Sequence, residues 1–287
     1  MLIYVKHFAQ MCNRFWALTP ILAYALHRKQ KLFVLFARKD YLDCFPQLKK
    51  CNNVYFLFCH NNPRPNPLEW RVGLLSERFN LEVHGELRNL DRINFLTFIN
   101  GWQHSCDKSF IQEHKKEIVK LFEPSCKIVN KVNCYFEEYD GITIGVHIRR
   151  GDYKNYLDGK YYFEDDIYIR AINSMRNELE NECRQVRFLI CSNEPCEMSD
   201  NCDDVFSIKS TDGVTDLYAL TRCDYIIGPP SSYSQWASFV GDVPLCFILS
   251  PNFIASKGHF SSIVSFNRFA NNKELIFDEK KQEYYII

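Results

Sequence analysis

The chain contains Ile142-Thr143-Ile144-Gly145-Val146, followed directly by His147-Ile148-Arg149-Arg150-Gly151-Asp152-Tyr153, and this segment gives the strongest indication of the fold. Its first five residues are an apolar run that predicts a buried strand. Two consecutive arginines then carry positive charge at the end of that strand, and each guanidinium offers a rigid fork of donors that suits phosphate oxygens. Gly151 allows the backbone to turn sharply after them. The pattern predicts an anion site, most simply for a diphosphate, at the carboxyl end of a strand.

The same residues also allow interpretations that involve no ligand. Two arginines in a loop also form solvated basic turns, and a single histidine at a strand end is often a satisfied core residue. Arg150-Gly151-Asp152 matches the cell-adhesion tripeptide, but a match this short recurs by chance too often to support that function. The neighbouring motifs therefore decide the interpretation.

The composition of the chain limits its function classes. The 287 residues carry 35 basic and 35 acidic side chains, so no global field attracts nucleic acid or anionic lipid. The 13 cysteines include no Cys-x-x-Cys pair, which predicts reduced thiols and neither a disulfide framework nor a zinc site. The run Met1–Lys6 is too short for a signal peptide, and no apolar run approaches the ~20 residues of a membrane helix. We expect a cytoplasmic protein with no transmembrane segment; peripheral association with the inner face of a membrane stays open.

Strands alternate with helices along the chain, which predicts an α/β fold with parallel sheets. In the first half, the expected strands and helices are Leu2–Val5, Asn13–Arg28, Leu32–Ala37, Val54–Phe58, Lys108–Phe122 and Pro124–Phe136. Thr19 before Pro20 leaves open a later start for the first helix, because proline suits the first helical turn. Residues 68–100 support no firm prediction.

The second half has a clearer strand–helix rhythm. The expected elements are Ile142–His147, Glu164–Leu179, Val186–Cys191, Val205–Ile208, Val214–Thr221, Tyr225–Gly228, a helix from Ser231 or Ser232 to Phe239, and a last strand at Pro244–Leu249. The polar segment 137–141 predicts a boundary between domains of residues 1–138 and 139–265. The apolar residues within 266–287 predict a segment that packs back on the first domain.

Three strand ends of this second half are expected to meet at one crevice, because ligands of parallel sheets bind outside the carboxyl ends of the strands. They carry the arginine motif, then Ser192-Asn193-Glu194, then Gly228-Pro229-Pro230-Ser231-Ser232-Tyr233-Ser234. One serine at a helix start is explained by N-capping alone. Three serines after a rigid Pro-Pro turn favour an anion at the helix N-terminus.

Other phosphate-binding signatures are missing from the sequence. It contains no P-loop motif, no dinucleotide glycine fingerprint and no Asp-x-Asp pair. Neutralisation of a leaving diphosphate is therefore expected from arginine, hydroxyls and helix N-termini, with no metal and no cofactor.

The motif His147-Ile148-Arg149-Arg150-Gly151-Asp152 resembles the His-x-Arg-Arg-x-Asp signature of the α-1,2-fucosyltransferases, glycosyltransferase family 11, which α-1,6-fucosyltransferases share more loosely. The resemblance runs from about Met1 to Leu249 with the motifs in family order. Its other members are Gly101-Trp102-Gln103, Tyr161-Tyr162, Phe188–Glu194, Asp216-Leu217-Tyr218-Ala219-Leu220 with Cys223, and Ser231–Ala237.

This resemblance implies a GT-B-like architecture: an acceptor-side first domain and a nucleotide-sugar-binding second domain, both Rossmann-like, facing an interdomain cleft. It implies inverting, metal-independent transfer of fucose from GDP-fucose to a glycan hydroxyl, with O2 of galactose expected. Arg149 would bind the β-phosphate and, with Asp152, form the catalytic pair. The remaining nucleotide-sugar-binding residues that it implies are His147, Arg150, Asn193, Asp216, Ser231, Ser232, Ser234, Asn13 and Arg14.

Several positions depart from the family pattern. The segment Ala9–Arg14 keeps Asn13 but lacks both family glycines, Ser192-Asn193-Glu194 replaces an Asp-Asp pair, and Pro229-Pro230 replaces an asparagine. Two alternatives therefore stay open: a transferase of the same fold that uses another nucleotide sugar, or a non-catalytic nucleotide- or glycan-binding protein.

The general base is also open. Its candidates are Asp152, Glu164 and Asp158, of which the last two are better explained by helix capping and loop solvation. Trp102 or Tyr156 could stack on an acceptor sugar, although core packing is the more usual role of aromatic residues.

Overall fold

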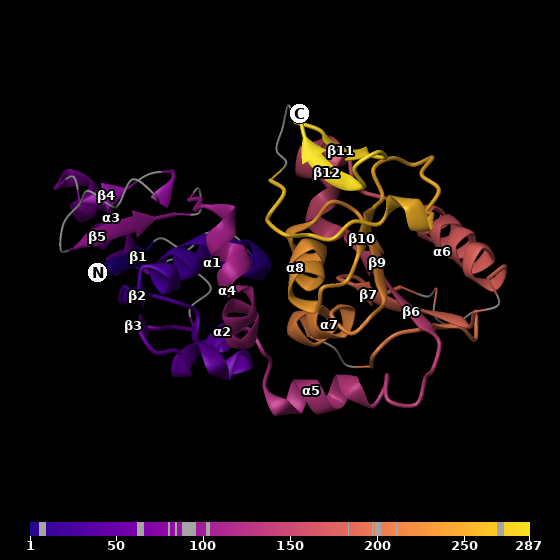
Figure 1. Ribbon diagram of the computed structural model, residues 1–287, viewed down its shortest axis with the longest axis horizontal. Coiled ribbons are helices and arrows are strands. Elements are labelled where there is room, and N and C mark those ends of the chain that lie inside the picture. The colour runs from indigo at the N-terminus through magenta and orange to yellow at the C-terminus, as the bar shows by residue number, and fades with distance from the viewer. Residues whose placement is uncertain are drawn as a thin grey trace. The chain divides into compact units, whose positions relative to one another are not determined.

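The computed structural model describes residues 1–5, 10–61, 66–79, 81–83, 85–87, 96–101, 104–182, 184–196, 198, 202–209, 212–268 and 273–287. The chain divides into two compact units, Met1–Ser125 and Cys126–Ile287. Over the described residues each unit is built on a five-stranded sheet (Figure 1). The prediction of two parallel-sheet α/β domains is therefore confirmed. The boundary lies earlier than the sequence placed it, because helix α5 (Cys126–Asn133) packs against a helix of the second unit.

The sheet of the first unit has the strand order β3-β2-β1-β5-β4, with all neighbours parallel. Its strands are β1 (Leu2–Val5), β2 (Leu32–Leu35), β3 (Val54–Leu57), β4 (Glu82–Val83) and β5 (Thr97–Asn100). Its helices are α1 (Met11–His27), α2 (Lys39–Cys44), α3 (Pro67–Arg78) and α4 (Lys108–Leu121). Thus α3, β4 and β5 occupy much of the region 68–100, which the sequence left without a prediction.

Helix α1 starts at Met11 and continues through Pro20, so the later start is wrong. The hydroxyl of Thr19 donates to the Phe15 carbonyl at 2.8 Å and does not cap a new helix. A proline inside a helix costs about 3 kcal/mol. Nearly the whole circumference of α1 is buried from Phe15 to Ala25, and each large apolar side chain contributes roughly 1.5–3 kcal/mol. Tertiary burial therefore outweighs the local preference for a break.

The sheet of the second unit has the order β10-β9-β6-β7-β8, again all parallel. Its strands are β6 (Ile142–Ile148), β7 (Val186–Ser192), β8 (Val205–Phe206), β9 (Tyr225–Gly228) and β10 (Leu245–Phe247). Figure 1 shows helix α6 (Asp165–Glu180) on one side of this sheet and helices α7 (Gly213–Leu220) and α8 (Ser232–Gly241) on the other. Every residue of β6 is buried, as expected of a central strand in a parallel sheet. The order reverses between β6 and β9, and such a switch point is where open α/β sheets bind ligands.

After β10 the chain adds a two-stranded antiparallel hairpin, β11 (Leu275–Asp278) and β12 (Glu283–Ile286), that the sequence did not predict. The Tyr284 hydroxyl accepts a hydrogen bond from the Phe247 amide at 2.7 Å and donates to the His259 carbonyl at 3.0 Å. Leu245 pairs with Ser261 through two backbone hydrogen bonds of 2.9 and 3.0 Å. The described residues 266–268 and 273–287 therefore belong to the second unit, and docking of this segment on the first domain stays a prediction.

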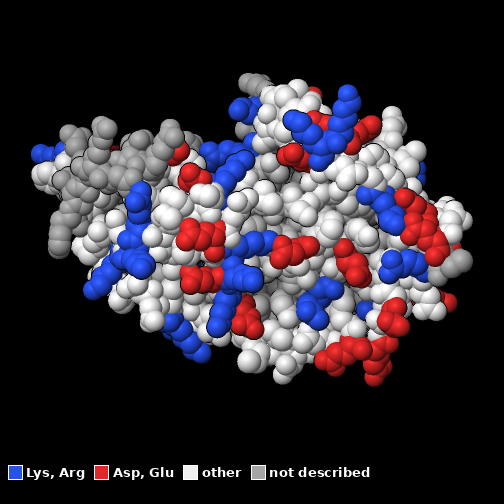
Figure 2. All heavy atoms as spheres, in the orientation of Figure 1, with Lys and Arg blue, Asp and Glu red and all other residues white. Residues whose placement is uncertain are grey.

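The surface and the thiols agree with the composition. On the face in view, acidic and basic side chains are interspersed (Figure 2). All twelve cysteines within the described part of the chain are free thiols. Among the described helices, none combines the length and the apolar character needed to cross a bilayer.

Candidate functional site

The candidate site lies at the carboxyl end of β6, next to the switch point of the second sheet. The chain leaves β6 at Ile148 and passes through the two arginines into a 3-10 turn at Gly151–Lys154. Strand β9 approaches β6 so closely that a Cβ on Gly228 would lie 2.7 Å from the His147 carbonyl oxygen. Glycine at this position therefore lets the two strand ends meet.

Arg149 is held at this edge by an ion pair. Its Nη2 lies 2.7 Å from Asp152 Oδ1, with 18% of the arginine side chain and 51% of the aspartate side chain exposed. The guanidinium also lies over the Tyr153 ring, 5.6 Å from its centroid. Because the Tyr153 hydroxyl donates to the Pro230 carbonyl at 2.7 Å, this ring connects the arginine loop to the turn before α8. The structure thus brings Arg149, Asp152 and the start of α8 together.

Arg150 has a different role. Its Nη2 is hydrogen-bonded to Asp165 in the first turn of α6, and only 11% of its side chain is exposed. Burial acts to lower the pKa of Arg150, but the hydrogen bond and the negative charge of Asp165, with smaller contributions from Cys196 and Tyr162, together outweigh it and the pKa is raised. The guanidinium of Arg150 therefore ties the loop to α6, and its predicted part in nucleotide-sugar binding stays a prediction.

Asn193 closes the same loop from β7. Its Oδ1 accepts a hydrogen bond from the Arg150 amide at 2.7 Å. Gly151 has φ +60°, and a Cβ there would lie 3.1 Å from Asn193 Nδ2. A left-handed backbone and a close neighbour both favour glycine at this turn. Asn193 thus shapes the arginine loop through the backbone.

His147 is buried and stacks on Tyr233, with ring centroids 4.9 Å apart. Burial, and secondarily the charge of Arg149, lower the pKa of His147 to about 3. Its Nδ1 is buried without a hydrogen-bond partner. The Tyr233 hydroxyl donates to the Gly213 carbonyl at 2.7 Å, so this stack joins β6 to the starts of α7 and α8. The imidazole is neutral at physiological pH and packs against the Tyr233 ring at the edge of the candidate site.

The three serines at the start of α8 are not equivalent. Ser231 is the N-cap: its Oγ accepts from the Tyr233 amide at 3.1 Å. The Ser234 hydroxyl is fully buried and donates to the Ser231 carbonyl at 3.3 Å. Ser232 alone of the three is partly exposed. The capping explanation therefore holds for Ser231.

The remaining predicted site residues lie on α7 and in the first unit. Asp216 lies half-buried in α7, and its carbonyl accepts from the Cys191 thiol at 3.8 Å. Asn13 and Arg14 lie in the first turn of α1 in the first unit, where the Arg14 guanidinium is 6.0 Å from the centre of the Tyr41 ring. Trp102 and Gln103 lie outside the described residues.

The acid candidates for a base lie on the loop that follows the arginines. Glu164 occupies the N-cap position of α6 but makes no side-chain cap hydrogen bond. Leu157 and Asp158 both have positive φ, 51° and 55°, inside the 3-10 turn Tyr156–Gly159. Two consecutive left-handed residues other than glycine are a costly backbone arrangement of the kind that clusters at functional sites. Tyr156 in this turn is 39% exposed, so its ring is not a core residue.

Two residues that position the site were not singled out from the sequence. Tyr153 links the Arg149 loop to Pro230, and Tyr233 links His147 to Gly213. Both tyrosines belong to motifs that the sequence did quote. A buried tyrosine hydroxyl needs a partner, which is the signal that could have marked them as connectors.

A separate cavity of about 700 Å³ lies near the amino ends of β7 and β8, lined by residues that include Arg184, Val186 and Asp204. It is at the opposite edge of the sheet from Arg149. Because parallel sheets bind ligands at the carboxyl edge, the cavity is not part of the candidate site.

Three comparisons with known proteins indicate the family of the chain and the proteins that share its fold. The model of the family described as glycosyl transferase family 11 matches residues 94–269. The chain is also similar to an α-1,2-colitosyltransferase of Escherichia coli, with 24% identity over 195 residues that cover 63% of each protein. The match thus spans just under two thirds of that relative's length.

Solved structures of fucosyltransferases share the fold. The chain resembles a variant of Arabidopsis thaliana FUT1 in complex with GDP, with a TM-score of 0.54, 14% identity, and coverage of 91% of this chain and 72% of that one. It resembles the fucosyltransferase NodZ from Bradyrhizobium with a TM-score of 0.53, 16% identity, and coverage of 91% and 97%. For POFUT1 in complex with GDP the values are 0.53, 12%, 84% and 94%. With the matched family model extending over more than half of its residues, the chain belongs to glycosyl transferase family 11.

Proposed function

We propose that this protein is an inverting, metal-independent fucosyltransferase that moves fucose from GDP-fucose to a hydroxyl of a glycan, O2 of galactose being the proposed acceptor atom. The observation that carries the proposal is the position of Arg149 beside the capped N-terminus of α8 at the β6–β9 switch point. A fixed guanidinium and a helix N-terminus are the two donors that a diphosphate needs. The proposal places the enzyme in the cytoplasm, where its many thiols stay reduced.

The chemistry follows from where charge develops. As the bond between the sugar carbon and the diphosphate oxygen breaks, its electron pair stays on GDP. The added charge is stabilised by Arg149 and by the amides at the start of α8. The acceptor oxygen forms its bond to the same carbon from the opposite face, and its proton passes to a base. Asp152 is our candidate for that base, since it is the half-exposed carboxylate next to Arg149.

Metal independence rests on the use of the nearby carboxylates. Asp152 is paired with Arg149, and Asp165 of α6 with Arg150, so the two carboxylates that contact the arginines already neutralise a protein cation. No Asp-x-Asp pair is present to hold a divalent ion at the diphosphate. Arginine therefore supplies the positive charge in this proposal.

The sugar carried by GDP has a second candidate. The curated relative in Escherichia coli is a colitosyltransferase by name, which favours colitose as an alternative to fucose. Either sugar would leave the diphosphate contacts at Arg149 unchanged. The two donors are therefore distinguished at the sugar and not at the nucleotide.

The test is a thermal-shift titration of the purified protein with GDP, UDP, CDP, GDP-fucose and GDP-colitose, in EDTA. A ligand that binds only the folded state raises its stability, by about 2.7 kcal/mol at a hundred times the dissociation constant. We expect shifts with GDP and with one GDP-sugar, followed by transfer of that sugar to a galactose-terminated acceptor in the same buffer. The linkage of the product is then read by NMR.

The other outcomes are equally informative. A shift with UDP alone would keep the fold and overturn the donor. Binding of GDP without transfer to any galactose-terminated acceptor would favour the non-catalytic alternative. Transfer that stops in EDTA and returns with magnesium would overturn metal independence.

A further inference from the structure

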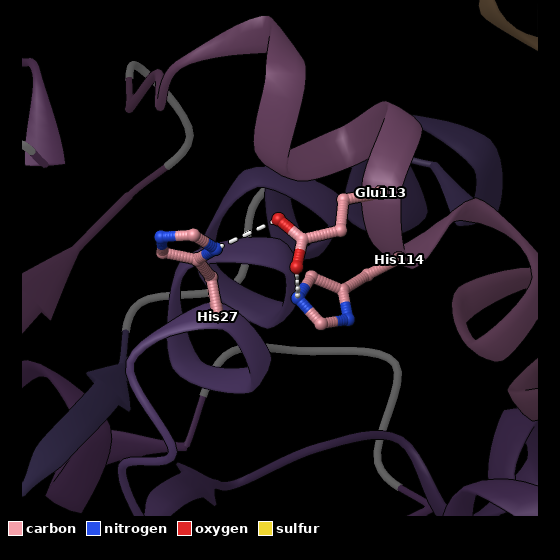
Figure 3. A group of neighbouring side chains, drawn as sticks. All are labelled: His27, Glu113 and His114. Atoms are coloured by element: carbon pink, nitrogen blue, oxygen red, sulfur yellow. Dashed lines mark hydrogen bonds and ion pairs between the residues drawn. The ribbon is translucent and has the colours of Figure 1, made fainter.

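Two helices of the first unit bring a histidine–carboxylate–histidine group together, far in sequence from the arginine motif. His27 is the last residue of α1, and Glu113 and His114 are neighbours on α4 (Figure 3). His27 Nδ1 lies 2.9 Å from Glu113 Oε2, and His114 Nε2 lies 3.7 Å from Glu113 Oε1. One donor atom from each residue lies within 4.8 Å of the others. We propose that this group is a binding site for a divalent transition metal, with Zn²⁺ as the best-suited ion.

The donor types fit such an ion. Two imidazole nitrogens and one carboxylate are ligands that zinc and its neighbours prefer, and three protein ligands leave a position for water. Tetrahedral ligands about 2.1 Å from an ion stand about 3.4 Å apart. Because Glu113 is exposed and His27 ends its helix, small side-chain rotations are sufficient to reach that spacing from the observed one.

His114 is prepared as a ligand by a second carboxylate. Its Nδ1 lies 3.0 Å from Glu117 Oε2, one turn further along α4. A proton on Nδ1 that is donated to Glu117 leaves a lone pair on Nε2, and that atom is buried without a hydrogen-bond partner. A lone pair facing a carboxylate oxygen at 3.7 Å is repulsive, and either a proton or a metal ion between the two atoms relieves that repulsion. Carboxylate–histidine–metal arrangements of this kind fix the ring and strengthen the ligand.

His27 is also held in place. Its ring stacks on Phe110, with centroids 3.8 Å apart and planes inclined by 16°. As the last residue of a 17-residue helix, it sits where the helix dipole favours a cation. Glu113 and Glu117 together balance the charge of a dication, while both imidazoles bind as neutral groups. The ion would join the end of α1 to the middle of α4.

The experiment is titration with zinc chloride, read by calorimetry, and with Co²⁺, read by its visible absorption. We expect one site with nitrogen and oxygen ligands, which gives ligand-field bands without the thiolate-to-cobalt charge transfer that cysteine ligands produce. His114→Gln and His27→Gln should each weaken zinc binding at least about 100-fold. Glu117→Gln should weaken it about 10- to 100-fold, because the second carboxylate no longer fixes the His114 ring.

His60→Gln, in the same unit but outside the group, is the matched control and should bind zinc as the wild type does. Metal-free circular dichroism checks that every variant is folded. If either histidine variant does not fold, the other carries the test. Zinc binding that both histidine variants retain, or a charge-transfer band in the wild type, would assign the ion to cysteines and overturn the proposal. The absence of stoichiometric binding by the wild type would overturn it as well.

Discussion

The two sheets each have a central strand at a switch point, β6 in the second unit and β1 in the first. The residues and helices at the carboxyl ends of these two strands differ. Beyond β6, Arg149 and Arg150 are each paired with a carboxylate, and the adjacent helix α8 is capped by Ser231. Helix α1, which follows β1 in the first unit, starts at Met11, and its N-cap residue Gln10 makes no side-chain cap hydrogen bond. One topology thus carries paired arginines and a side-chain-capped helix in one unit, and a helix without a side-chain cap hydrogen bond in the other.

This difference teaches that topology alone does not create a site. The switch point provides room and a helix dipole, and the residues that follow the strand decide what binds there. In the second unit those residues are fixed by partners from three other elements: Asp165 of α6, Asn193 after β7 and Pro230 before α8. We therefore expect donor binding to depend far more on the second unit than on the first.

The largest effect is expected from Arg149→Ala. Loss of the guanidinium that stabilises the leaving diphosphate should lower kcat by about 10²- to 10³-fold, because a donor aimed at developing charge is worth that much. Arg14→Ala, at the start of α1, should lower it by no more than about tenfold. Transfer assays with the GDP-sugar measure both.

The control for this pair is Arg184→Ala, an exposed arginine at the opposite edge of the second sheet, which should retain wild-type activity. Near-normal transfer by Arg149→Ala would remove its assigned role. An Arg14 effect as large as the Arg149 effect would show that the two units contribute equally.

A smaller effect concerns His147 and pH. The pKa of this buried imidazole is lowered to about 3, so its contribution to stability is present above the unfolded pKa of about 6.5 and is lost as pH falls toward 3. Between pH 7 and pH 5 the free energy of unfolding should fall by about 2 kcal/mol from this residue alone. Urea unfolding of wild type and His147→Gln measures it.

In His147→Gln the pH dependence over this interval should be flatter by that amount. If the His147 variant keeps the wild-type pH dependence, the imidazole is not held neutral by the fold.

The smallest effects concern the two helix starts. Ser231→Ala should lower the stability of the second unit by about 1 kcal/mol, because the Tyr233 amide loses its acceptor. Gln10→Ser should stabilise the first unit by roughly 0.5 kcal/mol, since Gln10 already has the extended backbone of an N-cap. Denaturant unfolding, followed separately for each unit, measures the change in stability caused by each substitution. Equal changes of the same sign would contradict the proposed difference between the two helix starts.

The sequence predicted the parallel sheets well because buried strands have an unmistakable apolar pattern. Tyr225–Gly228 was predicted to the residue, and Ile142–His147 to within one. It also predicted Arg149 at a strand end, since charge directly after an apolar run must leave the sheet there. Local signals were sufficient for these features.

What the sequence could not predict depends on distant partners. Pro20 is accommodated inside α1 because the surrounding core buries the helix, which no local pattern reveals. The pairing of Arg150 with Asp165 depends on where α6 begins in space. In the His27–Glu113–His114 group, His27 and Glu113 are 86 positions apart in the sequence, so no short motif could predict it.

The final hairpin matters for how the second sheet ends. Strand β10 is an edge strand, and edge strands with unpaired amides invite pairing with other chains. Here Ser261 pairs with Leu245, and the Tyr284 hydroxyl accepts a hydrogen bond from the Phe247 amide. The outward-facing amide donors of β10 are therefore bound by later residues of the same chain. Shortening the chain before Tyr284 would therefore expose a template for strand addition, and self-association would follow before any loss of the Arg149 loop.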